Sequence, residues 1–192
     1  MSPAYPQAVV IGASAGALEA LSAILPALPP DFTPPILIVV HVPPDRPSVL
    51  AELFRAKCQR PVREAEDKEP IADGTIYFAP PGYHLLVEAG KTLALSSDEP
   101  VLFSRPSIDV LFESAADAYG PGLVGIVLTG ANTDGAEGLR TIAHSSGLAF
   151  VQEPQEAFAS AMPEAAIRLV PAAIVLPLGQ IAARLQTLRA VS

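Results

Sequence analysis

Half of the 192 residues are hydrophobic and only 17% are charged, a composition typical of one compact globular domain and unlike extended disorder. A formal net charge of -8 excludes general attraction to nucleic acid or to anionic lipid surfaces. A single cysteine, Cys58, excludes an internal disulfide.

Apolar runs bounded by turn residues alternate along the chain with segments of helical spacing. The apolar runs predict buried parallel strands at 8–11, 36–40, 122–130, 148–152 and 172–177. The segments between and after them predict helices at 16–28, 47–58, 107–119, 135–146, 163–170 and 178–189. This alternation predicts an α/β fold, in which a doubly wound, mainly parallel sheet has helices on both faces. We expect residues 1–192 to form one domain.

The segment 61–97 breaks this rhythm. Turns at Asp73-Gly74, Pro81-Gly82 and Ala89-Gly90 separate three short apolar stretches. This pattern predicts an antiparallel hairpin or meander attached to the parallel sheet.

The sequence also predicts where the protein resides. The start, MSPAYPQ, lacks the basic region and apolar segment of a signal peptide. The apolar runs are too short to cross a bilayer. We therefore expect a cytoplasmic protein with no membrane insertion.

The stretch VVIGASAGALEAL, residues 9–21, carries Ser14 from the first predicted strand into the first helix. Gly12 and Gly16 give the backbone room for a sharp turn, and the helix directs free N–H groups at the site. Two other interpretations stay open. Glycine-rich turns also bind nucleotides in Rossmann-like proteins, although neither G-x-G-x-x-G nor a P-loop is complete here, and small residues can simply allow close packing of helix on strand.

Two further polar residues stand at or after the ends of predicted parallel strands. His41 closes the second strand, and Asp134 follows the third. A serine, a histidine and an aspartate at one sheet edge supply a nucleophile, a general base and a group that orients the base. Alternatively, His41 is structural and Asp134 caps the helix that begins near Gly135. No group of histidine, cysteine and carboxylate residues has metal-ligand spacing, and we expect no metal or other cofactor.

An ordered series of motifs runs from about Val9 to Ile167: VVIGASAGALEAL, VVHVPP, IYFAPPGYHLLV, SRPSIDVLFESAA, GIVLTGANTDGAEGL and QEPQEAFASAMPEAAI. The series resembles the catalytic domain of the CheB-type chemotaxis receptor-glutamate methylesterases. By this resemblance Ser14 is the catalytic serine, His41 the histidine and Asp134 the aspartate. The chain order Ser, His, Asp differs from the Ser, Asp, His order of the α/β-hydrolases.

The resemblance implies hydrolysis of glutamate methyl esters on a helical receptor-type signalling protein, with methanol released, and possible deamidation of glutamine. It implies attack by Ser14, proton transfer through His41, orientation of His41 by Asp134 and an oxyanion held by backbone N–H groups, Ala15 being the obvious one. Arg105, in SRPSID, either contacts substrate or braces the next helix. Ser107 is a predicted helix N-cap, and His84 is predicted to be structural or exposed.

Three departures from the family pattern stand out. Gly16-Ala17 replaces the usual Gly-Gly, and the segment 130–134 reads Gly-Ala-Asn-Thr-Asp where the family has Gly-Met-Gly-x-Asp. Many relatives also carry a receiver domain, for which the first strand near residue 8 leaves no room, so we expect any receiver or methyltransferase partner to be a separate protein. The competing hypotheses are a weakly active or inactive interaction module of a signalling system and a Rossmann-like nucleotide-binding protein.

Overall fold

A parallel sheet of seven strands forms the centre of the molecule in a computed structural model that describes residues 6–188. The spatial order is β3-β4-β2-β1-β7-β8-β9, and every pairing in it is parallel. The strands span Ala8–Ala13 (β1), Ile36–Val40 (β2), Val62–Glu64 (β3), Ile76–Phe78 (β4), Leu123–Val127 (β7), Leu148–Gln152 (β8) and Ile174–Leu176 (β9). Residues 1–5 of the start, for which no signal peptide is predicted, and residue 189 of the last predicted helix lie outside the described residues.

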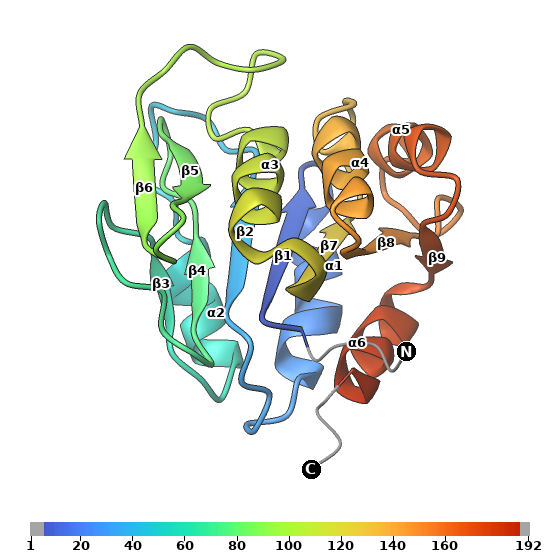
Figure 1. Ribbon diagram of the computed structural model, residues 1–192, viewed down its shortest axis with the longest axis horizontal. Helices are drawn as coiled ribbons and strands as arrows, with labels where there is room; N and C mark the ends of the chain where they lie inside the picture. The colour runs from blue at the N-terminus through green and yellow to red at the C-terminus, as the bar shows by residue number, and fades with distance from the viewer. Residues whose placement is uncertain (1–5, 189–192) are drawn as a thin grey trace.

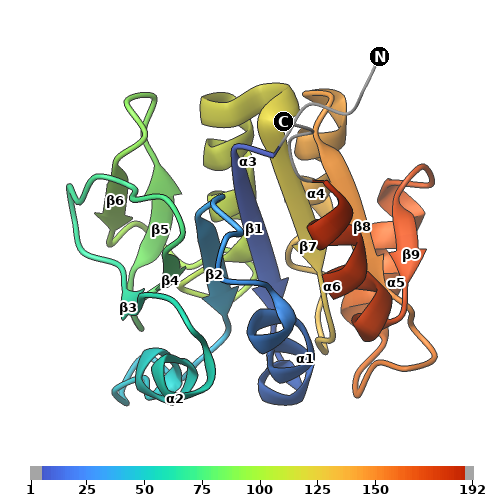
Figure 2. The same ribbon diagram turned by 90° about the horizontal axis from the view of Figure 1, so that it is seen from below.

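Helices cover both faces of this sheet (Figures 1 and 2). They span Ala17–Ile24 (α1), Leu50–Lys57 (α2), Ile108–Tyr119 (α3), Ala136–His144 (α4), Ala161–Leu169 (α5) and Leu178–Thr187 (α6). Figure 2 shows α1, α2 and α6 on one face and α3 and α4 on the other. The predicted doubly wound α/β fold is confirmed. No helix within residues 6–188 is long and apolar enough to span a membrane.

The two faces bury separate cores because successive strand residues point to opposite sides. Val9 and Ile11 of β1 pack in the core beneath α1, whereas Ala8 and Val10 pack in the core beneath α3. All four side chains are fully buried. A central strand that is apolar on both faces is what the continuous run in the sequence predicted.

The segment 61–97 differs in part from the expectation. An antiparallel hairpin is present, formed by β5 (His84–Val87) and β6 (Leu93–Ser96). The apolar stretch before it is instead the parallel strand β4, which pairs with β2 in the main sheet. All three residues of β4 are buried, and a short buried run does not reveal from its spacing whether its neighbour is parallel. The edge strand β3 escaped prediction because only one of its three residues is buried.

Candidate active site

Ser14 and His41 are the first residues beyond two neighbouring parallel strands. Ala13 of β1 pairs in register with Val40 of β2, and the backbone N–H of His41 donates to the carbonyl of Ala13 at 3.2 Å. Adjacent strands lie about 4.8 Å apart. The register therefore brings the serine and the histidine side by side at the carboxyl edge of the sheet, where both strands end.

Two hydrogen bonds join the turn that carries Ser14 to Thr129, in the segment after β7. The Ser14 N–H donates to the Thr129 carbonyl at 2.9 Å, and the Thr129 hydroxyl donates to the Ala15 carbonyl at 2.8 Å. Gly16 has a φ of +84°, and a Cβ there would lie 2.6 Å from the Cβ of Phe158, so only glycine fits. Among the described residues no protein acceptor pairs with the Ala15 N–H, which leaves that donor available at the start of α1.

Asp134 is fully buried and its carboxylate accepts four hydrogen bonds. Oδ2 accepts from His41 Nε2 at 2.7 Å and from the Ile108 N–H at 2.7 Å. Oδ1 accepts from the Ser107 hydroxyl and from the Asp109 N–H, each at 3.0 Å. Burial raises the pKa of this carboxyl, but the bonds from His41, Asp109 and Ile108 outweigh it and hold the pKa below its ordinary value. Asp134 is thus an anion fixed against the imidazole.

Asp134, which precedes α4, caps the N-terminus of α3, and Asp109 of α3 caps the N-terminus of α4. Ser107 occupies the N-cap position of α3, as predicted, but its hydroxyl bonds Asp134, and Asp134 caps α3. In return, Oδ1 of Asp109 in α3 accepts from the N–H groups of Gly135, at 3.0 Å, and Gly138, at 2.7 Å, at the start of α4. Burial, reinforced by the charge of Asp134, raises the pKa of Asp109 to about 7. The alternative in which Asp134 caps the helix beginning near Gly135 is therefore wrong, because Asp134 caps the neighbouring helix α3.

The imidazole of His41 presents Nδ1 to the side away from Asp134. This is the reverse of the commoner arrangement, in which Nδ1 faces the aspartate and Nε2 faces the nucleophile. The side-chain amide of Asn132 lies at 3.4 Å from Nδ1, whereas the described residues show no hydrogen bond from the Ser14 hydroxyl to the ring. Catalytic hydrogen bonds are often long before substrate binds. Nδ1 is the nitrogen available to act as base.

A cavity of about 380 Å³ opens beside His41. Its wall includes Pro43, Phe103, Ser104 and Arg105. Arg105 braces the loop that forms this wall, because its guanidinium donates to the carbonyls of Ser97 and Asp98 at 2.9 and 3.0 Å.

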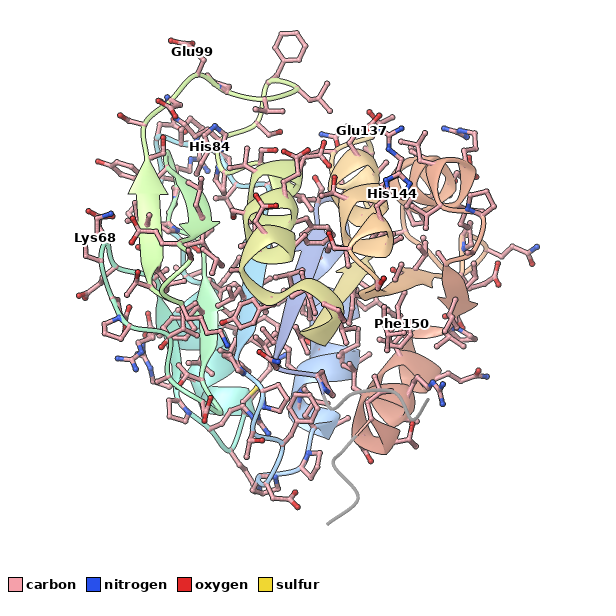
Figure 3. The ribbon with its side chains drawn as sticks, viewed as in Figure 1. Lys68, His84, Glu99, Glu137, His144 and Phe150 are labelled. Atoms are coloured by element: carbon pink, nitrogen blue, oxygen red, sulfur yellow. The ribbon has the colours of Figure 1, made fainter. Side chains whose placement is uncertain are left out.

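His84 has the structural role predicted for it. Figure 3 shows His84 beneath the loop that carries Glu99, and the His84 Nε2 lies 3.0 Å from the Glu99 carbonyl. Its Nδ1 accepts from the Ser107 N–H at 3.1 Å. The ring therefore ties the start of α3 to the loop over the cavity.

Sequence reasoning missed three residues of this region. Asp109, in the first turn of the predicted helix 107–119, and Thr129, inside the predicted strand 122–130, were not singled out. Asn132 was noticed only as a departure from the family pattern. Their positions depend on contacts across the sheet edge, so the one available signal was their nearness in sequence to Ser107 and Asp134.

Fold and geometry define this protein as a doubly wound α/β domain with a serine, a histidine and an aspartate at the carboxyl edge of its sheet. The profile of the CheB methylesterase family matches residues 9–185, and the chain belongs to that family.

Three similar proteins illustrate the relationship. A protein of Leptospira interrogans, serovar copenhageni, provisionally named protein-glutamate methylesterase/protein-glutamine glutaminase, is 47% identical over 176 residues, 92% of this chain and 91% of that protein. The Archaeoglobus fulgidus protein-glutamate methylesterase/protein-glutamine glutaminase is 38% identical, covering 91% of this chain but 51% of its own length. The crystal structure of the Thermotoga maritima CheB methylesterase catalytic domain superposes with a TM-score of 0.91 at 32% identity, covering 95% of this chain and 98% of that one.

Proposed function

We propose that this protein is a protein-glutamate methylesterase that converts glutamate methyl esters on a chemoreceptor-type protein to glutamate and methanol, and that also deamidates glutamine. Relatives similar over most of this chain carry both activities in their names, and CheB methylesterases act on methylated chemoreceptors. One observation carries the chemical proposal. Ser14 and His41 directly follow neighbouring strands that pair in register, and Nε2 of His41 lies 2.7 Å from the carboxylate of the buried Asp134.

The proposed reaction begins with attack of the Ser14 Oγ on the ester carbonyl carbon. The hydroxyl proton passes to Nδ1 of His41 as the Oγ–C bond forms. Asp134 keeps the proton on Nε2 and stabilises the imidazolium that results. The Ala15 N–H, at the start of α1, donates to the oxyanion.

Collapse of this first tetrahedral intermediate breaks the bond from carbon to the methoxy oxygen. That oxygen takes the proton from Nδ1 and leaves as methanol, so Ser14 holds an acyl group. Water then gives a proton to Nδ1 and attacks the acyl carbon, and the bond to Oγ breaks with return of the proton to Ser14. The product is a glutamate side chain. With glutamine as substrate, ammonia leaves in place of methanol.

The surroundings of the site suggest how substrate is held. We assign Arg105 to the wall of the substrate cleft, because it lines the cavity beside His41 while its guanidinium braces the loop above. We further propose that residues 1–192 form one catalytic domain that acts in the cytoplasm, and that a receiver or methyltransferase protein is a signalling partner.

The first experiment is labelling with a fluorophosphonate, followed by peptide mass spectrometry to locate the adduct. Ser14→Ala and His41→Ala should abolish labelling, because one removes the nucleophile and the other removes its base. Ser104→Ala is the matched control, since this serine lines the cavity beside His41 and its loss should leave labelling intact. Methanol release from a methylated receptor then measures turnover. Equal labelling of Ser14→Ala, or a folded wild type that neither labels nor releases methanol, would refute the proposal.

A further inference from the structure

The side-chain amide of Asn132 bridges the turn after β7 and the imidazole. Its Oδ1 accepts from the backbone N–H of Asp134 at 3.0 Å, and its Nδ2 lies 3.4 Å from Nδ1 of His41. The orientation of this amide follows from chemistry. A backbone N–H can only donate, so the atom that faces it is the carbonyl oxygen, and the NH₂ group is left facing His41.

This orientation determines the role of the ring nitrogen. An NH₂ group donates and has no lone pair to offer, so Nδ1 must accept. The single proton of the neutral ring is then on Nε2, where the carboxylate of Asp134 accepts it at 2.7 Å. Asn132 and Asp134 approach opposite sides of the imidazole and favour the same tautomer.

We propose that Asn132 is a positioning residue that keeps Nδ1 of His41 unprotonated and turned toward the serine. This inference rests on the proposed function, because Nδ1 is the atom that receives the proton of Ser14. At 3.4 Å the bond is long, and the serine hydroxyl can displace the amide as substrate enters. Asn132 is itself held by the backbone N–H of Asp134, whose carboxylate binds Nε2 of His41. One turn therefore fixes both sides of the ring.

Asn132→Asp provides the sharpest test. The aspartate keeps an oxygen for the Asp134 N–H but places an acceptor where Nδ1 needs a donor, so a proton is drawn onto Nδ1. The other titratable or charged groups near the ring are Asp134, Asp109, whose carboxyl interacts with that of Asp134, and Arg105, which lines the cavity beside His41. None of these changes in the variant. Asn132→Ala removes both bonds and adds no charge.

The ring ¹⁵N chemical shifts of His41 report directly which nitrogens carry protons, and His41→Ala assigns them. The wild type should have the proton on Nε2 alone. Asn132→Asp should show protons on both nitrogens at a pH where the wild-type ring carries one. Asn132→Ala should keep the proton on Nε2, because Asp134 still accepts it, and should change only the shift of Nδ1, which loses its donor. Thr133→Asp is the matched control: it adds the same charge one residue along, where the side chain lines a different cavity, and should leave the shifts unchanged.

Kinetics give a second readout. We expect kcat about tenfold lower in Asn132→Ala with KM within twofold, and for Asn132→Asp a displacement of the acid limb of the kcat/KM profile to higher pH. Wild-type shifts in Asn132→Asp would overturn the inference whatever the activity. A wild type that releases no methanol but shows the expected shifts would instead refute the proposed function alone.

Discussion

Replacement of Asp134 by asparagine tests the buried carboxylate most directly. Two of the four donors that reach it are backbone N–H groups, one on each oxygen, from Ile108 and Asp109. Asparagine offers one oxygen and one NH₂ group. Ser107 can rotate its hydroxyl and His41 can change tautomer, but a backbone N–H cannot become an acceptor. In either orientation of the amide, one buried N–H therefore faces another donor.

The size of the effect follows from this geometry. One buried N–H without an acceptor costs about 1–3 kcal/mol, and weakening of the charge-assisted bonds raises the expected loss in free energy of unfolding to about 2–5 kcal/mol. The negative charge that would stabilise the imidazolium is also lost, and one amide orientation puts the ring proton on Nδ1. We expect kcat to fall roughly 10³-fold while KM stays within about twofold.

Urea denaturation and methanol release from a methylated receptor measure the two effects separately. Ser107→Ala is the matched control, because it removes one of the four bonds to Asp134 but keeps both the charge and the contact with His41. Its kcat should stay within about threefold of wild type, with about 1 kcal/mol lost in stability. A folded Asp134→Asn protein whose kcat is within tenfold of wild type would show that Asp134 does not orient the catalytic base.

Three other predictions concern stability and are measured by urea denaturation. Because the native pKa of Asp109, about 7, lies above its ordinary 3.8, the folded state binds this proton more tightly and the contribution of Asp109 to stability falls as pH rises from about 4 to 7. The free energy of unfolding of Asp109→Asn, relative to that of the wild type, should therefore rise by up to about 4 kcal/mol between pH 4 and pH 8. A difference that stays constant with pH would contradict this prediction. Leu102 and Phe103 have φ values of 47° and 64° in the same tight turn, so replacing the pair by Asn-Gly should raise the free energy of unfolding by about 1–2 kcal/mol; an unchanged midpoint would argue against strain. Gly12→Ala should cost about 1–3 kcal/mol, because the new Cβ would lie 2.3 Å from Cγ2 of Ile108, and a neutral result would mean that α3 shifts freely.

Much of the fold could be predicted because its information is local. Continuous apolar runs specified β1, β2 and β7 as buried strands, and helical spacing located the helices between strands to within a few residues. Parallel strands place their carboxyl ends at one edge, so the sequence also predicted that Ser14 and His41 lie at a common edge. The parallel partner of β4 was not predictable, since both pairing directions suit a short, fully buried run.

The sequence by itself thus determined the α/β fold, the family and the residues gathered at the sheet edge. Only the tertiary structure decided which nitrogen of His41 faces Asp134, which helix Asp134 caps, and that the amide of Asn132 reaches the ring. These contacts join segments 26 to 93 residues apart, as in the bonds from Ile108 and His41 to Asp134. Hydrophobic periodicity indicates which face of a helix or strand is buried. Hydrogen-bond partners depend instead on how separate elements pack together, and the periodicity does not indicate that packing.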